Sequence, residues 1–426
     1  MMNKEILTSA RTGDSCIHVK HSSGLDIYIC EMNDFSSIEA LIGTKYGSVN
    51  NIFKNAADSD YTTVPEGIAH FLEHKLFENE DCGVFELYAR TGASCNAFTS
   101  FDKTCYLFSC SKNYEENLKI LLEFVQKPYF TKENVDKEMG IIGQEIKMTN
   151  DNPEWRVFFN MLRGMYHNHP IKIDIVGTAD SIAQIDADLL YKCYDAFYNL
   201  NNMVLSIAGN ISADKVLEIC DKYLKPSEDK GLETVFPDEP AEIVTAEITE
   251  KQPVGASIFQ LGYKCTPSKG EQRLKDVAAA STAAALITDP ALPMCERLLK
   301  EEIINSTFDG EVFYGGGYFT VYFSGESDRP RDIREAVFAE IERLINEGIR
   351  EKDFQRIKKT AYGMMIRGLN NVEAVANLML TAHMDNVGPY DTIDVLSDLT
   401  CDDVIDYMRR EMRPDRSVLS VITKEA

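Results

Sequence analysis

Apolar and polar residues alternate along the chain with two periods, one typical of strands and one typical of helices. Apolar stretches of strand length cover residues 103–110 and 318–324. Each is followed by a segment with one apolar face at helical spacing, residues 115–126 in the first half and 332–346 in the second. The pattern therefore predicts the same succession, a strand and then an amphipathic helix, in both halves of the chain.

A second predicted helix follows the first in each half after a short break, and it begins with charged residues. These helices start at Thr131 in the first half and at Arg350 in the second. The repetition predicts a duplicated unit. Strands mixed with helical hairpins favour an α+β fold with two homologous domains, each a mostly antiparallel sheet with helices packed on one face.

The two halves are separated by the most polar, proline- and glycine-punctuated interval of the sequence, residues 226–240. Such a composition is typical of an interdomain linker. At 426 residues the chain is also too long for one ordinary core. We therefore predict a first domain over residues 1–225, a linker over 226–240 and a second domain over 241–426.

Acidic residues outnumber basic ones, 68 Asp and Glu against 44 Lys and Arg, which gives a formal charge of −24. That balance makes nucleic acid and an anionic membrane surface poor partners. Two interpretations of the acidic excess remain open. The carboxylates line an inner wall and attract basic peptides, or they only keep the protein in solution.

Sequence features that report on the cell compartment all favour the cytoplasm. No apolar run approaches the roughly 18 to 20 residues that span a bilayer. Residues 1–13 are polar and lack the apolar segment of a secretory signal. The eleven cysteines include no Cys-x-x-Cys pair, which fits reduced thiols better than a disulfide framework or a cysteine-rich metal site. We therefore expect a cytoplasmic protein that does not bind membranes.

The sharpest chemical pattern is His70-Phe-Leu-Glu-His74, in a segment where Pro65 and Glu66 suit the first turn of a helix. Residues four apart lie on one face of a helix, so the two imidazoles can bind one metal ion. Glu73 projects beside that face, within reach of a water on the metal. The order H-x-x-E-H is that of the inverted zincins. The alternative is a pair of surface histidines beside a solvated glutamate.

A catalytic zinc site of this type needs a third protein donor. Glu138 and Glu145 lie seven residues apart in the predicted helix that starts at Thr131, and hence on one face of it. Ile142 and Ile146 make part of that helix apolar, where a buried carboxylate is costly unless it binds a metal or a partner. On the residues alone, two solvated helix charges explain these glutamates about equally well.

The stretches around these residues resemble one family of peptidases. Residues 67–77, Gly-Ile-Ala-His-Phe-Leu-Glu-His-Lys-Leu-Phe, are similar to the signature of the pitrilysin, insulinase and mitochondrial processing peptidase family. The resemblance is specific over residues 40–225 and concerns only the pattern of elements in the second half. Further stretches that agree in order and spacing are 92–106, Glu138 with 144–145, 166–178 and 202–210.

Membership of this family would imply a fold and an activity. The implied fold is the mitochondrial processing peptidase-like metallohydrolase fold of a short, two-domain bacterial-type member. The implied activity is that of a zinc-dependent endopeptidase that hydrolyses peptides or short unfolded polypeptides in an enclosed chamber. The alternative is a non-catalytic or peptide-binding subunit of a heterodimeric peptidase.

The resemblance also assigns roles by position. It implies one zinc ion per chain, bound by His70, His74 and Glu145. Glu73 becomes the general base that acts on a zinc-bound water. Glu138 becomes a residue that orients a ligand histidine instead of binding the metal.

Substrate binding is implied for the segment that contains the Asn-Ala-Phe-Thr-Ser run. Asn96 and Ala97 fall on the edge strand along which family members bind peptides in extended, strand-adding form. Main-chain pairing of this kind depends on the extended shape of a peptide more than on the identity of its side chains.

Two departures from the family pattern concern the second half. Lys300 and Ser306 stand where family members usually have the Arg and Tyr that stabilise the oxyanion. Ile357 and Met364 stand opposite Glu138 and Glu145 when the two helical hairpins are aligned. We therefore predict an inactive second domain that forms the other wall of the chamber. We also predict a homologous zinc-less partner subunit in a heterodimer, with a homodimer as the alternative.

Overall fold

The computed structural model of the protein describes residues 4–80 and 82–424. The chain forms two compact units, and each unit contains a segment from the other half of the sequence. The first unit comprises Met1–Ile146, Asp174–Val235 and Met365–Tyr390. The second comprises Lys147–Ile173, Phe236–Met364 and Asp391–Ala426. The compact units thus do not follow the predicted boundaries of 1–225 and 241–426 throughout, and the roles given to those two domains stay predictions.

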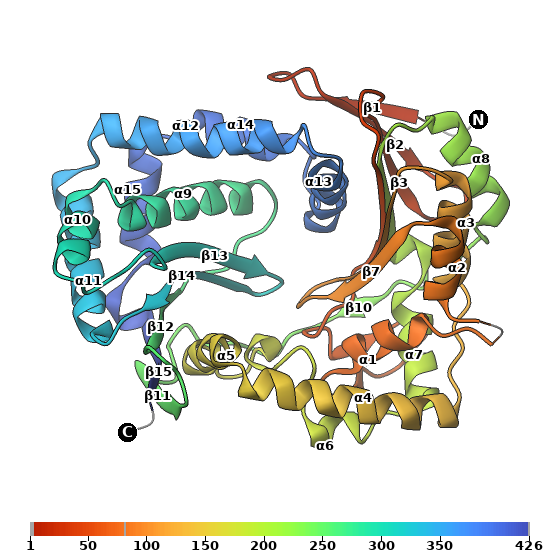
Figure 1. Ribbon diagram of the computed structural model, residues 1–426, viewed down its shortest axis with the longest axis horizontal. Coiled ribbons are helices and arrows are strands. Elements are labelled where there is room, and N and C mark those ends of the chain that lie inside the picture. The colour runs from red at the N-terminus through yellow and green to blue at the C-terminus, as the bar shows by residue number, and fades with distance from the viewer. Residues whose placement is uncertain (1–3, 81, 425–426) are drawn as a thin grey trace. The chain divides into compact units, whose positions relative to one another are not determined.

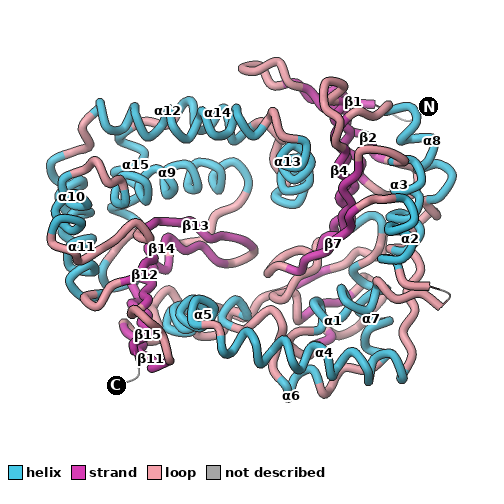
Figure 2. Tube along the Cα trace, viewed as in Figure 1, coloured by secondary structure: helices cyan, strands magenta, loops and turns pink. Residues whose placement is uncertain are grey.

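The first unit is built on a seven-stranded sheet with the order β1-β2-β3-β9-β4-β8-β7. Neighbouring strands are antiparallel except β3 and β9, which are parallel. Figure 2 shows these strands as one continuous band with helices on both faces. In sheet order the strands are β1 (Lys4–Thr8), β2 (Ser15–Lys20), β3 (Asp26–Glu31), β9 (Met203–Gly209), β4 (Ile38–Thr44), β8 (Thr104–Cys110) and β7 (Ser94–Thr99).

One face of this sheet carries the main core of the first unit. Ile27, Ile29 and Ile42 project from alternate strand positions into that core, as the two-residue period of a strand requires. The helices of the unit are α1 (Ile68–Leu76), α2 (Val84–Thr91), α3 (Tyr114–Phe124), the larger part of α4 (Lys132–Asp151), α6 (Ala179–Ile182), α7 (Ala187–Phe197), α8 (Ala213–Tyr223) and α13 (Val372–Asp385).

The second unit is built on a five-stranded sheet with the order β11-β15-β12-β14-β13. Only β11 and β15 are parallel, so the sheet repeats the order and the strand directions of β3-β9-β4-β8-β7. This repetition confirms the predicted α+β fold with two homologous, mostly antiparallel sheets. The strands are β11 (Glu247–Gln252), β15 (Ser417–Lys424), β12 (Ile258–Lys264), β14 (Tyr318–Glu326) and β13 (Asp309–Gly315).

The helices of the second unit follow the same succession as those of the first. Where α3 and α4 come after β8, α11 and α12 come after β14, and the predicted strand and first helix in each half end within two residues of the observed ones. The helices are α5 (Pro153–Met165), α9 (Gly270–Thr288), α10 (Pro293–Lys300), α11 (Pro330–Glu347), the larger part of α12 (Glu351–Gly368), α14 (Asp391–Asp398) and α15 (Cys401–Glu411).

Helices α5 and α13 hold equivalent places in the two halves, and each packs on the sheet of the other half. Helix α13 packs against β3, β4 and β9 in the first unit, and α5 packs against β11, β12 and β15 in the second. Figure 1 shows α13 on the face of the first sheet opposite to α3 and α8. All seven residues of β4 and of β12 are consequently buried, although only one face of each strand was expected to carry helices.

A glycine in each sheet allows this close packing. A Cβ at Gly43 in β4 would lie 2.9 Å from Met384 Cε of α13, and a Cβ at Gly262 in β12 would lie 2.5 Å from Met161 Sδ of α5. Gly43 is paired with Val204, and Gly262 is paired with Val418. We call α13 and α5 the exchanged helices, because each packs on the sheet of the other half. Each of them therefore packs over a glycine that is paired with a valine on the neighbouring strand.

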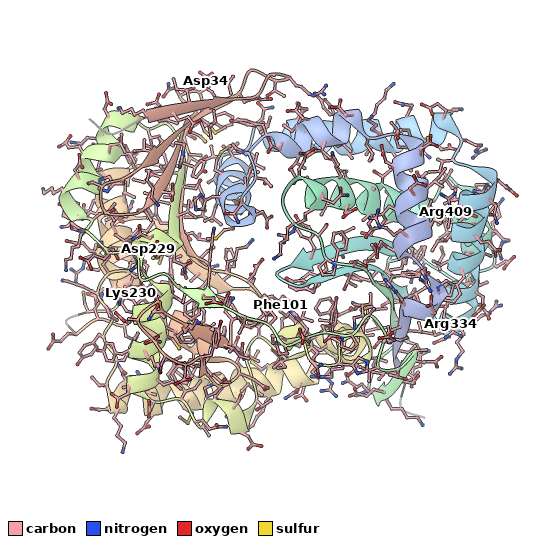
Figure 3. All side chains as sticks on the ribbon, turned by 180° about the vertical axis from the view of Figure 1, so that it is seen from behind. Asp34, Phe101, Asp229, Lys230, Arg334 and Arg409 are labelled. Carbon is pink, nitrogen blue, oxygen red and sulfur yellow. The ribbon has the colours of Figure 1, made fainter. Side chains whose placement is uncertain are left out.

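Charged side chains form many ion pairs, both within one helix and between elements far apart in the sequence. Arg334 of α11 pairs with Glu247 of β11, and Arg409 of α15 pairs with Asp406 one turn earlier (Figure 3). Such exposed pairs contribute a few tenths of a kcal/mol each.

No single helix in the described part of the chain is long and apolar enough to cross a bilayer. Helices α9 and α10 reach that length and hydropathy only together, as a pair bent by 41°.

The predicted linker, residues 226–240, is held in its middle and at its C-terminal end. Glu233 and Thr234 form strand β10, which pairs with β5 (Ile52–Lys54) beside β6 (Thr62–Thr63) in a small sheet of the first unit. Residues 236–240 belong to the second unit, where Glu239 accepts hydrogen bonds from three successive backbone N–H groups, those of residues 167–169. The linker region is therefore a structured connection instead of a free chain.

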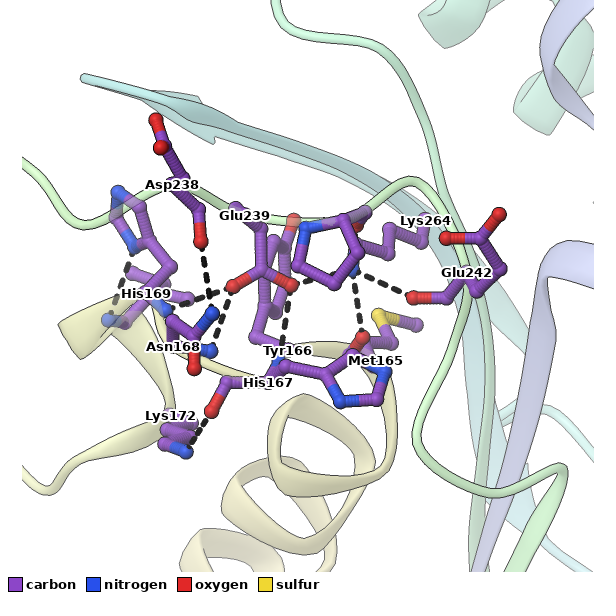
Figure 4. Close-up of polar contacts among 12 residues, drawn as sticks. Met165, Tyr166, His167, Asn168, His169, Lys172, Asp238, Glu239, Glu242 and Lys264 are labelled. Carbon is purple, nitrogen blue, oxygen red and sulfur yellow. Dashed lines mark hydrogen bonds and ion pairs between the residues drawn. The ribbon is translucent and has the colours of Figure 1, made fainter.

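Lys264 is the cation that completes this arrangement (Figure 4). Its ammonium donates to Glu239 Oε1 at 2.5 Å and to the backbone carbonyls of Met165, Pro240 and Glu242 at 2.8–2.9 Å. Burial opposes ionisation of Glu239, but the bonds from Lys264 and from the three N–H groups lower its pKa to about 2.

Candidate metal centre

Helix α1 begins at Ile68 because the chain makes a tight left-handed step at Gly67, where φ is 84°. A Cβ at Gly67 would lie 2.5 Å from the carbonyl oxygen of Val176, so only glycine fits. The predicted start at Pro65 was therefore three residues too early. Pro65 and Glu66 lie in the turn that leads into the helix.

Helix α1 is buried on nearly all sides, with an apolar face in the core and a polar face that carries the histidines. Ile68, Phe71, Leu72 and Leu76 are part of the hydrophobic core of the first unit. His70, Glu73 and His74 lie on the other face, where His70 and Glu73 are each 8% exposed. The alternative of two surface histidines beside a solvated glutamate is thus wrong.

Glu145 of α4 faces the two histidines. Its Oε1 lies 3.6 Å from His70 Nε2 and its Oε2 lies 3.7 Å from His74 Nε2, both too long for a hydrogen bond. Within residues 4–80 and 82–424, His70, His74 and Glu145 form the one group of three metal-ligating side chains whose ligand atoms all lie within 4.8 Å of one another.

The separations of these atoms fit a zinc ion. Ligands about 2.0–2.1 Å from a tetrahedral zinc lie roughly 3.4 Å apart, close to the two distances observed. Two imidazoles and a carboxylate are also a donor set that catalytic zinc uses. The three residues therefore could hold zinc, and their role as ligands stays a prediction.

The two glutamates of α4 have different surroundings. Glu138 is buried, and its Oε1 accepts a hydrogen bond of 2.9 Å from His74 Nδ1. Because an ionised carboxylate only accepts, Nδ1 carries the proton of this bond, and in the neutral form of His74 the lone pair that a metal needs is then at Nε2. The side chain of Glu145 is 37% exposed and makes no such bond to the histidines. Glu138 therefore contacts His74 on the side away from Glu145, and its role in orienting that histidine stays a prediction.

The electrostatics of the cluster favour neutral, metal-competent histidine at His70. Burial, and then the charge of His74, lower the pKa of His70 to about 3. Burial alone would also lower the pKa of His74, but the hydrogen bond to Glu138 and the charges of the nearby glutamates raise it. Burial would raise the pKa of Glu138, and the bond and charge of His74 bring it below its usual value.

Glu73 lies beside the cluster and is held by strand β7. Thr99 Oγ1 donates to Glu73 Oε2 at 3.0 Å, and Thr104 Oγ1 lies 3.3 Å from Thr99 Oγ1 and donates to the carbonyl of Tyr46. Burial raises the pKa of Glu73. Sequence reasoning missed Thr99, although the Asn-Ala-Phe-Thr-Ser run that contains it had been noted for Asn96 and Ala97.

Asn96 and Ala97 lie on β7, the terminal strand of the seven-stranded sheet. Asn96 is exposed and its Oδ1 accepts a hydrogen bond from the backbone N–H of Ala97 at 2.9 Å. The strand is thus at a sheet edge, as expected, and it also carries the Thr99 that holds Glu73. Substrate binding by these two residues stays a prediction.

Comparison with known proteins assigns the chain to a family. The family model described as insulinase, peptidase family M16, matches residues 59–179, and the model of the M16 inactive domain matches residues 184–361. An uncharacterized zinc protease of Bacillus subtilis, YmfH, is 36% identical over 427 residues, which cover 96% of this chain and 97% of the relative. The chain belongs to the M16 peptidase family.

Other M16 relatives agree with this assignment. The crystal structure of an M16-like peptidase from Alicyclobacillus acidocaldarius superposes with a TM-score of 0.92 at 29% identity, covering 100% of this chain and 99% of that one. A mitochondrial-processing peptidase subunit beta of Schizosaccharomyces pombe is 28% identical over 195 residues, 44% of this chain and 40% of the relative. Several relatives are named zinc proteases, which supports a peptidase function for this M16 member.

The described residues of the second unit contain no counterpart of the metal-ligating cluster. Ile357, aligned with Glu138, is buried in α12, and Met364, aligned with Glu145, is 69% exposed. Lys300 pairs with Glu296 on the surface of α10, and Ser306 is exposed in the loop before β13. None of these residues resembles a metal ligand or a buried oxyanion donor.

Proposed function

We propose that this M16 member is a zinc-dependent endopeptidase that hydrolyses peptides and short unfolded polypeptides. One zinc ion would be held by His70, His74 and Glu145. The observation that supports this most directly is the convergence of three metal-ligating side chains beside a buried glutamate, Glu73, whose carboxylate accepts a hydrogen bond from Thr99.

The chain's own residues account for the remaining parts of the reaction. A bound zinc ion would supply Lewis acidity towards a carbonyl and towards water. Glu73, held by Thr99, would accept a proton from the attacking water and pass it to the leaving amine. Glu138 would keep the His74 ring in place. The edge of β7 would bind the peptide in extended form next to Glu73.

The preference for peptides rests on the enclosed chamber that the family resemblance implies. The eleven cysteines, seen as free thiols, support work in a reducing compartment, which we take to be the cytoplasm.

The test is Glu73→Gln in the protein purified from its own cells, so that any partner subunit is retained. Zinc content should stay at one ion per chain, while hydrolysis of a quenched fluorescent peptide library falls at least about 100-fold. Glu133→Gln, an exposed residue on α4, is the matched control and should change neither quantity. Cleavage at the wild-type rate in Glu73→Gln would contradict the proposed mechanism, and absence of zinc in the wild type would contradict the metal site.

We also propose a homologous, zinc-less partner chain that supplies oxyanion donors, with a homodimer as the alternative. The support is that Lys300 and Ser306 occupy the places of the family's Arg and Tyr, and that one relative is named as a subunit of a processing peptidase.

A further inference from the structure

Lys75, the residue after His74, is a fully buried cation that the mechanism above does not use. Its side chain is 0% exposed, at a position of α1 that follows Phe71 and Leu72 by one helical turn. A helix position on that face would ordinarily hold an apolar residue. An ammonium there costs several kcal/mol unless it is paired with an anion.

Two carboxylates lie beside this ammonium. Glu78 Oε2 is 2.6 Å from Lys75 Nζ, and Glu138 Oε2 is 3.7 Å from it. Neither contact has the alignment of a hydrogen bond, so the attraction is that of charges. Glu78 is 34% exposed, whereas the side chain of Glu138 is 7% exposed, so the attraction to Glu138 is less screened by water.

The carboxylate of Glu138 thus meets two consecutive residues of α1. Its Oε1 accepts a hydrogen bond of 2.9 Å from His74 Nδ1, and its Oε2 faces the ammonium of Lys75. A carboxylate held at one oxygen can still rotate about that bond, whereas one held at both oxygens has a fixed plane. The orientation of that plane fixes the ring of His74, whose Nε2 points to Glu145.

We propose that Lys75 is a positioning residue of the metal centre, which acts by holding Glu138 so that His74 keeps the orientation needed to bind zinc. This inference rests on the proposed zinc site. Lys75 touches neither the metal position nor a substrate, and it acts only through Glu138.

The test measures the zinc dissociation constant of the full-length protein by competition with a chelating dye, for the wild type and Lys75→Met. Methionine keeps the length of the side chain without its charge, and replacing buried ion pairs by apolar residues is often tolerated. We expect zinc binding to weaken about tenfold to a hundredfold, as for other residues that hold a metal ligand. The cobalt-substituted protein should show a changed visible spectrum, because the position of His74 changes.

Glu78→Gln is the matched variant on the other side of Lys75. It leaves the ammonium with Glu138 alone, so zinc should bind at least as tightly as in the wild type. A tenfold loss in Glu78→Gln would overturn the proposal, because the pair with Glu78 would then be the one that matters. This variant changes a partly exposed residue, so the proposal can still be refuted where Lys75→Met does not fold.

The outcomes for Lys75→Met separate this inference from the proposed function. Zinc affinity and cobalt spectrum equal to those of the wild type would mean that Lys75 is only a structural ion pair, and would overturn the inference alone. Failure of the wild type to bind zinc would overturn the proposed function, and this inference with it.

Discussion

Glu239 gathers more hydrogen-bond donors than the usual surface carboxylate, because three backbone N–H groups and the Lys264 ammonium converge on it. These donors stabilise the ionised form and lower the pKa of Glu239 to about 2, from an ordinary value near 4.5. A depressed carboxyl pKa stabilises the folded state above the ordinary pKa, and that stability is lost as the pH falls through the folded pKa.

Glu239→Gln should therefore lower the free energy of unfolding at pH 7 by roughly 2 kcal/mol, because it removes the charge and leaves Lys264 without its anion. The difference from the wild type should shrink as the pH falls from about 5 towards 2. Urea midpoints measured at half-unit pH steps would check this.

Asp238→Asn is the control for that series, since Asp238 takes part in the same arrangement through its backbone carbonyl, which accepts from Asn168 Nδ2. Its midpoint should follow the wild type at each pH. A Glu239→Gln difference that stays constant across the pH range would show that the carboxylate charge contributes nothing.

At the level of single residues, some features of the candidate site could be predicted from the sequence and others could not. The spacing of His70 and His74 is a property of one helix, so their shared face could be predicted. Glu138 and Glu145 share a face of α4, and the local pattern could not tell that one is buried against His74 while the other converges with His70 and His74. Lys75 and Thr99 were missed because their partners, Glu138 and Glu73, lie on other elements.

At the scale of elements, the exchanged helices give the sharpest prediction. Gly262→Ala places a methyl group against Met161 and Met165 of α5, and Gly43→Ala places one against Met384 and Leu380 of α13. Each should lower the free energy of unfolding by about 1–3 kcal/mol, because a closely packed interface is overfilled. Gly262→Ala should lower the free energy of unfolding more than Gly43→Ala does, since its added methyl group would come closer to the neighbouring side chains. Thermal unfolding curves would measure both.

The matched control is Gly140→Ala on the exposed side of α4, where an added Cβ meets no atom within 4 Å. Alanine should raise stability there by about 0.5–1 kcal/mol, because glycine is a poor helix former. A Gly262→Ala protein as stable as the wild type would show that α5 does not pack on β12 as described.

The boundaries of the duplicated elements could be predicted because hydrophobic period is a local property. The start of α1 could not, since Gly67 is fixed by the distant Val176. Nor could the exchange of α5 and α13, because an amphipathic pattern shows that a helix has an apolar face and does not show which sheet covers it.

At the scale of the whole molecule, the proposed partner predicts a difference between the isolated and the assembled protein. The chain produced alone should bind zinc normally and cleave peptides at least tenfold more slowly than the complex recovered from its own cells, because oxyanion donors contribute about that much or more. Peptide hydrolysis and light-scattering mass, measured on both samples, would check this.

Two results would contradict the partner proposal. An isolated monomer that cleaves peptides as fast as the native complex would show that no second chain is needed. An isolated homodimer with full activity would favour the alternative assembly.

The reciprocal placement of α5 and α13 also affects the order in which the chain can fold during synthesis. Strand β9 completes the central strands of the first sheet at Gly209, but the helix that covers the sheet's second face begins only at Val372. At roughly 5 to 20 residues per second, the ribosome needs about 10 to 30 s to make the intervening chain. During that interval the nascent chain would present Leu41 and Val204 uncovered, so a chaperone acting at the ribosome would meet an unfinished sheet instead of a finished first domain.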